Sequence, residues 1–115
     1  MIGVIFEVIP AAGRKVGYLE VAAEKRALVE TMPGFISVER FQSLTDPDKI
    51  LSLSFWEDEA AVQRWRELEE HRAAQRSGRG GMFADDCLKV VEVLRDYGQQ
   101  DRAEAPGDSR EEHGA

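Results

Sequence analysis

The spacing of hydrophobic and polar residues changes along the chain in a regular order. Residues 2–9, IGVIFEVI, are mostly β-branched or aromatic with Glu7 as their single charge, and Pro10 ends the run, which predicts a strand. Residues 14–31 then place apolar side chains at helical spacing until Pro33-Gly34 stops the pattern. The chain therefore opens with a strand and a helix.

A hairpin is expected next. Residues 35–43, FISVERFQS, alternate in a way that predicts a strand with two unlike faces. One set of positions is Phe35, Ser37, Glu39 and Phe41, and the other is Ile36, Val38 and Arg40. The turn signal in residues 45–48, TDPD, joins this strand to an apolar strand at residues 50–56, so the two should pair antiparallel.

The last third of the chain predicts a second helix and a fourth strand. The helix spans about residues 57–75 and ends before the glycines of residues 78–81, and the strand spans about residues 85–94. The order β-α-β-β-α-β is that of the ferredoxin-like split βαβ fold in the α+β class, a four-stranded antiparallel sheet with both helices on one face.

The side of the sheet without helices is also expected to be apolar. Val4 and Phe6 alternate with Ile5 in the first strand, so both faces of the pleat carry hydrophobic groups. An identical sheet is the simplest cover for the second face, which predicts a homodimer.

Length and composition give one domain. The 115 residues suffice for a modest core, which we place at residues 1–98, and residues 99–115 are expected to form a flexible acidic tail because almost nothing in them can be buried. The net charge of −7 argues against nucleic acid as a partner. No apolar run is long enough for a membrane span, and the N-terminus lacks a signal-peptide pattern, so a cytoplasmic location is expected.

Resident cofactors and metals are not expected. Cys87 is the single cysteine, and we expect an inert buried thiol there. The spacing of cysteines and histidines fits no metal site, and the sequence carries no dinucleotide fingerprint.

The order of these segments resembles a known family. FISVERFQSL is followed by LSLSFWEDEAAVQRW, EEHRAAQ and GRGGMF, and this pattern is similar to the antibiotic biosynthesis monooxygenase (ABM) domain of the dimeric α+β barrel superfamily, over residues 1 to about 98. The resemblance implies the fold and the homodimer. Branches of the family include cofactor-free oxygenases of polyphenols and quinols, heme-degrading enzymes and members without an assigned reaction.

Site residues follow from the resemblance position by position. In the quinone-forming branch a strand Asn precedes the matched Trp56 by four residues, and here that position is Ser52. His71 lies close to the histidine of quinol-oxidising members. In the heme-degrading branch the pattern is Asn, Trp and an iron-binding His, and these positions fall on Glu7, Trp65 and Gln75; glutamine is a poor heme ligand.

Each candidate has a structural alternative. Trp56 and Trp65 serve either as pocket walls or as core residues, since Trp65 shares a helix face with Ala61. His71 points about 120° away from Trp65 and is either a catalytic base or a boundary histidine. Arg79 binds an anionic or phenolate group or lies in a plain connector. Phe83 completes the proposed pocket walls.

Glu7 and Glu39 are a further pair on predicted strands. They form an acid/base pair if both face the helices, or ion pairs with nearby arginines.

A phenol deprotonated in a dry pocket is electron-rich enough to reduce dioxygen without a cofactor. The first hypothesis is therefore a cofactor-independent monooxygenase of a small aromatic, polyphenol or quinol substrate. The second is a non-catalytic dimer that binds a small aromatic molecule, and the third is a heme-binding or heme-degrading protein.

Overall fold

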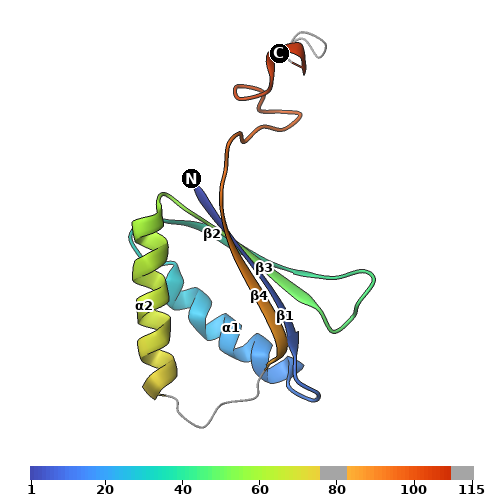
Figure 1. Ribbon diagram of the computed structural model, residues 1–115, viewed down its shortest axis with the longest axis vertical. Coiled ribbons are helices and arrows are strands. Elements are labelled where there is room, and N and C mark those ends of the chain that lie inside the picture. Colours follow the sequence, from blue (N-terminus) through green and yellow to red (C-terminus); the bar gives the residue numbers. More distant parts are fainter. Residues whose placement is uncertain (76–82, 110–115) are drawn as a thin grey trace.

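The chain folds as an α+β domain in the order that the sequence predicts. The computed structural model describes residues 1–75 and 83–109, except for the side chains of residues 71–75. The elements, drawn in Figure 1, are β1 (Ile2–Pro10), α1 (Lys15–Val29), β2 (Phe35–Gln42), β3 (Ile50–Trp56), α2 (Glu59–Gln75) and β4 (Phe83–Glu92).

The four strands form one antiparallel sheet in the order β2-β3-β1-β4. β1 lies in the centre and pairs with both β3 and β4, while β2 and β4 are the edges. Both helices lie on the same side of this sheet (Figure 1). The expected ferredoxin-like arrangement is confirmed.

A β-bulge at the start of β2 corrects the expected alternation. Phe35 pairs with Trp56 while Ser37 pairs with the adjacent Phe55, so two residues of β2 oppose one step of β3. A bulge of this kind adds one residue to one strand, so the residues before it point to the opposite face from the one that strict alternation gives. Phe35 therefore lies on the face of Val38, not on that of Ser37 as strict alternation predicted.

Cross-strand partners assign side chains to the two faces of the sheet. Val8 and Ile50 are partners, and both pack against Tyr18 of α1, so they lie on the helix-facing side. Cross-strand partners lie on the same face, and so do alternate residues of one strand, so these two contacts assign every other strand residue to a face. The helix-facing side carries Phe35, Val38, Arg40 and Gln42 on β2, Ile50, Ser52, Ser54 and Trp56 on β3, Ile2, Val4, Phe6 and Val8 on β1, and Asp86, Leu88, Val90 and Glu92 on β4.

Two buried clusters connect the helices to this side. In one, Val8 and Ile50 enclose Tyr18 near the start of α1. In the other, Trp56 packs with Val29 at the end of α1 and Ala61 in the first turns of α2. The core therefore sits at two ends of the sheet, and the middle of the helix-facing side lies between them.

The outer face of the sheet is apolar and no helix covers it. Its residues include Ile5 on β1, Phe41 on β2, Val91 on β4, and Leu51, Leu53 and Phe55 on β3. Phe41 is 44% exposed and Val91 39%. Gly3 makes room here, because a Cβ on it would lie 3.2 Å from Val91 Cγ2 and 3.3 Å from Phe55 Cε1.

Cys87 lies on the same outer face and is exposed, so the expectation of a buried thiol is wrong. β4 is an edge strand, and within the described ranges nothing packs over it at this point. Lys89 Nζ donates a hydrogen bond to Cys87 Sγ over 3.1 Å. This bond, followed by the electrostatic interactions of the Lys89 ammonium with Cys87 and Glu7, raises the pKa of Lys89.

Beyond β4 the chain leaves the body of the domain. Figure 1 shows the segment after Glu92 running away from the sheet and helices. Leu94 is 78% exposed along it, while Ala105 is buried and the Arg102 guanidinium lies over the Tyr97 ring at 5.4 Å. The expected boundary at residue 98 and the flexibility of the tail remain predictions. In the described ranges, neither helix is long and apolar enough to span a bilayer.

Candidate functional site

The middle of the helix-facing side carries a polar group of side chains between two aromatic clusters. We call Arg40, Ser52 and Ser54 the polar strip. Arg40 is the cross-strand partner of Ser52, and Ser54 lies two residues further along β3 on the same face. A polar strip flanked by aromatic groups is the usual make-up of a pocket that binds a small organic molecule.

The first aromatic cluster contains the predicted residue Phe83. Its ring meets those of Phe6 and Tyr18 edge to face, with centroids 5.9 and 5.6 Å apart. Phe83 remains 37% exposed at the start of β4. Because Phe6 is also the cross-strand partner of Ser52, this cluster borders the polar strip directly.

The second aromatic cluster contains the two tryptophans. Trp56 is 1% exposed and packs edge to face on Phe35, with ring centroids 5.4 Å apart. Trp65 is half-buried on the sheet-facing side of α2, and its ring centroid lies 6.3 Å from that of Trp56. Trp56 is thus enclosed by protein, while Trp65 keeps exposed surface that a ligand can reach.

The hydroxyls of the polar strip have different roles. Trp56 Nε1 donates a hydrogen bond to Ser54 Oγ over 3.0 Å. In contrast, Ser52 Oγ forms no hydrogen bond to any residue of the described ranges, and Ser52 is half-buried. The Ser52 hydroxyl therefore has no protein partner in the described part of the chain, whereas the Ser54 hydroxyl is engaged by Trp56. The predicted contact of Ser52 with a substrate stays a prediction.

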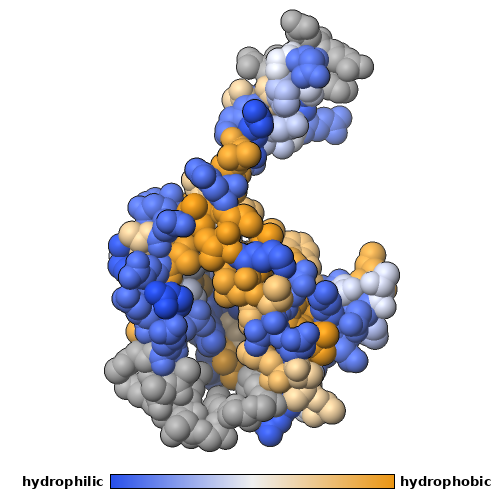
Figure 2. All heavy atoms as spheres, in the orientation of Figure 1, coloured by the Kyte–Doolittle hydropathy of each residue, from blue (hydrophilic) through white to orange (hydrophobic). Residues whose placement is uncertain are grey.

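The helix-facing side is least covered along β4. Leu88, the cross-strand partner of Phe6, is 57% exposed, and Val90 is 45% exposed. In Figure 2 hydrophobic surface lies over the sheet beside the hydrophilic surface of α2, and the molecule is hollowed between them. Apolar surface at Leu88 and Val90 is thus accessible from the side of the polar strip.

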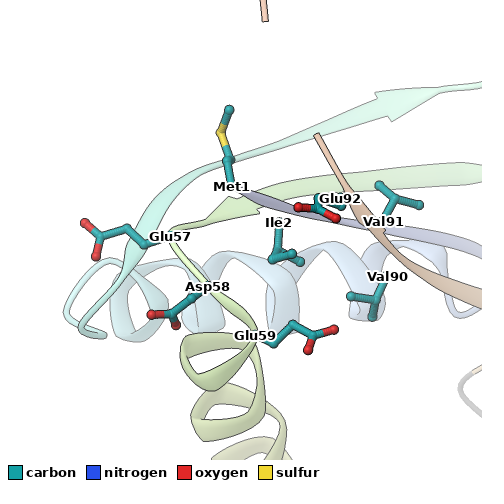
Figure 3. Close-up of a pocket in the computed structure, with 8 residues that line it drawn as sticks. All are labelled: Met1, Ile2, Glu57, Asp58, Glu59, Val90, Val91 and Glu92. Carbon is teal, nitrogen blue, oxygen red and sulfur yellow. The ribbon is translucent and has the colours of Figure 1, made fainter. Parts of the chain in front are cut away.

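A pocket of about 570 Å³ opens at the end of this region, where α2 begins. Figure 3 shows Ile2 and Val90 pointing from the sheet toward the helices, while Met1 and Val91 point the other way. Four carboxylates line it, from Glu57, Asp58, Glu59 and Glu92. Among the predicted site residues whose side chains the structure describes, none lines this pocket.

Two predicted site residues cannot be placed. Arg79 lies outside the described residues. His71 belongs to α2, but its side chain lies outside the described part of the chain, and the same holds for Gln75, which stands at the heme-ligand position. Their roles stay predictions.

The strand carboxylates do not form an acid/base pair under the helices. Glu7 pairs across the sheet with Leu51, and Glu39 with Leu53, which places both on the outer face. Glu7 forms an ion pair with Lys49 at 3.2 Å. The ion-pair alternative is correct for Glu7, although its partner is a lysine.

The structure adds Arg40 and Phe6 to the candidate residues. The sequence pattern assigned Arg40 and Phe41 to different faces of β2, and Phe6 and Ile5 to different faces of β1. It did not say which of the two faces the helices cover, because that depends on how α1 and α2 dock.

Comparison with known proteins assigns the family. A family model for antibiotic biosynthesis monooxygenases matches residues 1–77. The chain belongs to the antibiotic biosynthesis monooxygenase family, and the resemblance seen in the sequence is confirmed.

One relative carries a named activity. The chain is 42% identical over 93 residues to a protein of Pyricularia oryzae named jasmonate monooxygenase ABM. The match takes in 81% of this chain and 43% of the relative, so the chain spans less than half the length of that protein.

Solved structures agree on the fold. SnoaB from Streptomyces nogalater, a cofactor-independent oxygenase, superposes with a TM-score of 0.66 at 13% identity, covering 83% of this chain and 94% of its own. The heme-degrader MhuD from Mycobacterium tuberculosis gives a TM-score of 0.64 at 21% identity over 85% of this chain and all of MhuD. At these identities the likeness concerns the fold alone.

Proposed function

We propose that the protein is a monooxygenase that inserts one oxygen atom of dioxygen into a small, mostly apolar organic acid of the jasmonate type. The 42% identity to a jasmonate monooxygenase is the observation that carries this proposal. Jasmonate is a carboxylate on a largely hydrocarbon body. The polar strip is complementary to the carboxylate, and the apolar side chains around the strip are complementary to the hydrocarbon body.

The helix-facing side supports such a substrate in its composition. Phe83, Leu88 and Val90 offer accessible apolar surface, and Trp65 adds an aromatic wall on α2. Ser52 offers a hydroxyl without a competing partner in the described ranges. His71, carried over from the resemblance, is the proposed base.

A phenol or quinol is the second substrate class of the proposal. Deprotonated in a site shielded from water, such a molecule supplies its own electrons to dioxygen. The aromatic rings of Phe6, Tyr18 and Phe83 beside Ser52 favour a planar ring with a hydroxyl.

The active unit is proposed to be a homodimer joined through the outer faces of two sheets. The outer face presents apolar side chains from every strand, and Phe41 and Val91 remain substantially exposed in the single chain. Burying apolar surface of this kind stabilises association by about 25 cal/mol per Å² before association costs.

Oxygen incorporation tests the function. Hydroxylation of a C–H bond uses one O2, two electrons and two protons and releases one water, so jasmonate is incubated with the purified protein, ¹⁸O₂ and ascorbate as the electron donor. Phenols and quinols are incubated without a donor. We expect one ¹⁸O in the product, at a rate well above that of the protein-free reaction.

The matched variants are His71→Ala and His113→Ala, which remove the two histidines of the sequence in turn. We expect the first to reduce turnover by roughly 100-fold, within the range for general acid–base catalysis, and the second to leave it unchanged. Tight binding of either substrate class without oxygen uptake would contradict the monooxygenase proposal and would favour a non-catalytic dimer that binds a small molecule.

A further inference from the structure

Arg40 holds a distinctive place on the helix-facing side. It lies on the edge strand β2, directly opposite Ser52, and the same row continues through Phe6 to Leu88 on β4. A row across the sheet therefore runs from a guanidinium and a hydroxyl at one edge to accessible apolar side chains at the other.

The Nε atom of Arg40 has no hydrogen-bond acceptor among the residues that the structure describes. This atom is shielded from solvent, although the residue as a whole is only half-buried. A buried N–H without an acceptor is costly and calls for an explanation. The carboxylate next to it in the chain, Glu39, lies on the opposite face of the sheet and cannot supply one.

We propose that Arg40, with Ser52, binds the carboxylate of the substrate and thereby selects acids over neutral molecules. Arginine suits this role because its planar N–H groups match a carboxylate in a two-pronged hydrogen bond, which a lysine cannot reproduce. The inference rests on the proposed function and names the residue that gives it specificity.

The dimensions of the row fit a small acid. Neighbouring strands are about 4.8 Å apart, so β2 and β4, which are three spacings apart, are separated by roughly 14 Å. A carboxylate held at Arg40 and Ser52 directs the hydrocarbon body along Phe6 toward Leu88, which is 57% exposed. The acid group is thus bound at one edge and the apolar body at the other.

The test compares jasmonate with its neutral methyl ester. Dissociation constants of both are measured by calorimetry for the wild type, Arg40→Gln, Arg40→Lys and Arg66→Gln. Arg66 is the control because it is an exposed arginine on α2 that pairs with Glu70. Ester binding also reports that each variant is folded.

We expect the wild type and Arg66→Gln to prefer the acid by about 10- to 100-fold, the range of a charge-assisted hydrogen bond. Arg40→Gln should lose that preference by weakening acid binding alone, and Arg40→Lys should lose most of it. An unchanged preference in Arg40→Gln overturns the role of Arg40 while leaving the function standing. If neither the acid nor the ester binds to the wild type, the jasmonate-type substrate fails and Arg40 with it.

Discussion

The indole N–H of Trp56 donates a hydrogen bond to the hydroxyl of Ser54, two residues earlier on the same face of β3, with 3.0 Å between Nε1 and Oγ. The bond satisfies the one polar side-chain atom of Trp56, which is 1% exposed and the largest side chain among the buried residues of the second cluster. It also fixes the ring against which Trp65 packs. One wall of the candidate site is therefore oriented by a serine hydroxyl that is already engaged by the buried Trp56.

Ser54→Ala should lower the free energy of unfolding by about 1–2 kcal/mol, because the indole N–H is left without an acceptor in a region closed to water. Urea denaturation followed by tryptophan fluorescence measures the change. Glu20→Ala, at an exposed position of α1, is the control and should change stability by less than about 0.5 kcal/mol. Equal effects of the two variants would contradict the role of the bond.

Gly34→Ala should destabilise the fold by about 2–4 kcal/mol, since left-handed backbone disfavours a side chain and a core clash adds to it. Gly34 has φ +84°, and a Cβ there would lie 2.6 Å from the Cβ of buried Ala61. Gly17→Ala is the opposite case. Gly17 lies inside α1, and a Cβ added to it would meet no atom of the described residues within 4 Å beyond its own helical turn. Gly17→Ala should raise the free energy of unfolding by about 0.5–1 kcal/mol. Thermal melts measure both changes, and a Gly34→Ala variant as stable as the wild type would contradict the clash.

Asp58→Ala should cost about 1 kcal/mol of stability, because Asp58 caps α2. Its Oδ1 accepts a hydrogen bond from the backbone N–H of Ala61 over 2.9 Å, and the carboxylate lies at the positive end of the helix. Asp58→Asn keeps the acceptor and should lose less than half as much. If Asn proves as destabilising as Ala in chemical denaturation, the cap does not act through this hydrogen bond.

Leu53→Asp should convert the proposed dimer into monomers. Leu53 lies on the outer face with Ile5 and Glu39 as cross-strand partners, so a carboxylate there would be buried between the two sheets. Sedimentation velocity should give twice the 12.9 kDa chain mass for the wild type and the single mass for the variant.

Leu44→Asp is the matched control, since Leu44 is fully exposed in the β2–β3 connection and should leave the dimer intact. A wild-type protein that sediments at the single-chain mass at tens of micromolar would contradict the dimer itself.

The sequence alone determined the order of the elements and the class of the fold. The β-branched and aromatic run of β1, the helical spacing of α1 and the turn between β2 and β3 are local patterns, and local backbone preferences decide them. The motif of Trp56 and the acidic start of α2 identified the family, because it records a strand-to-helix junction that is continuous in the chain.

Only the tertiary structure decided which side of each strand meets the helices. The bulge at Ile36 places Phe35 on the same face as Trp56. Glu7 and Glu39 lie on the outer face, so neither carboxylate can act as a base in the candidate site. Arg40 became a candidate for the same reason. A strand pattern shows that its two faces differ, but helix docking, which depends on contacts between distant residues, selects the face that becomes a site.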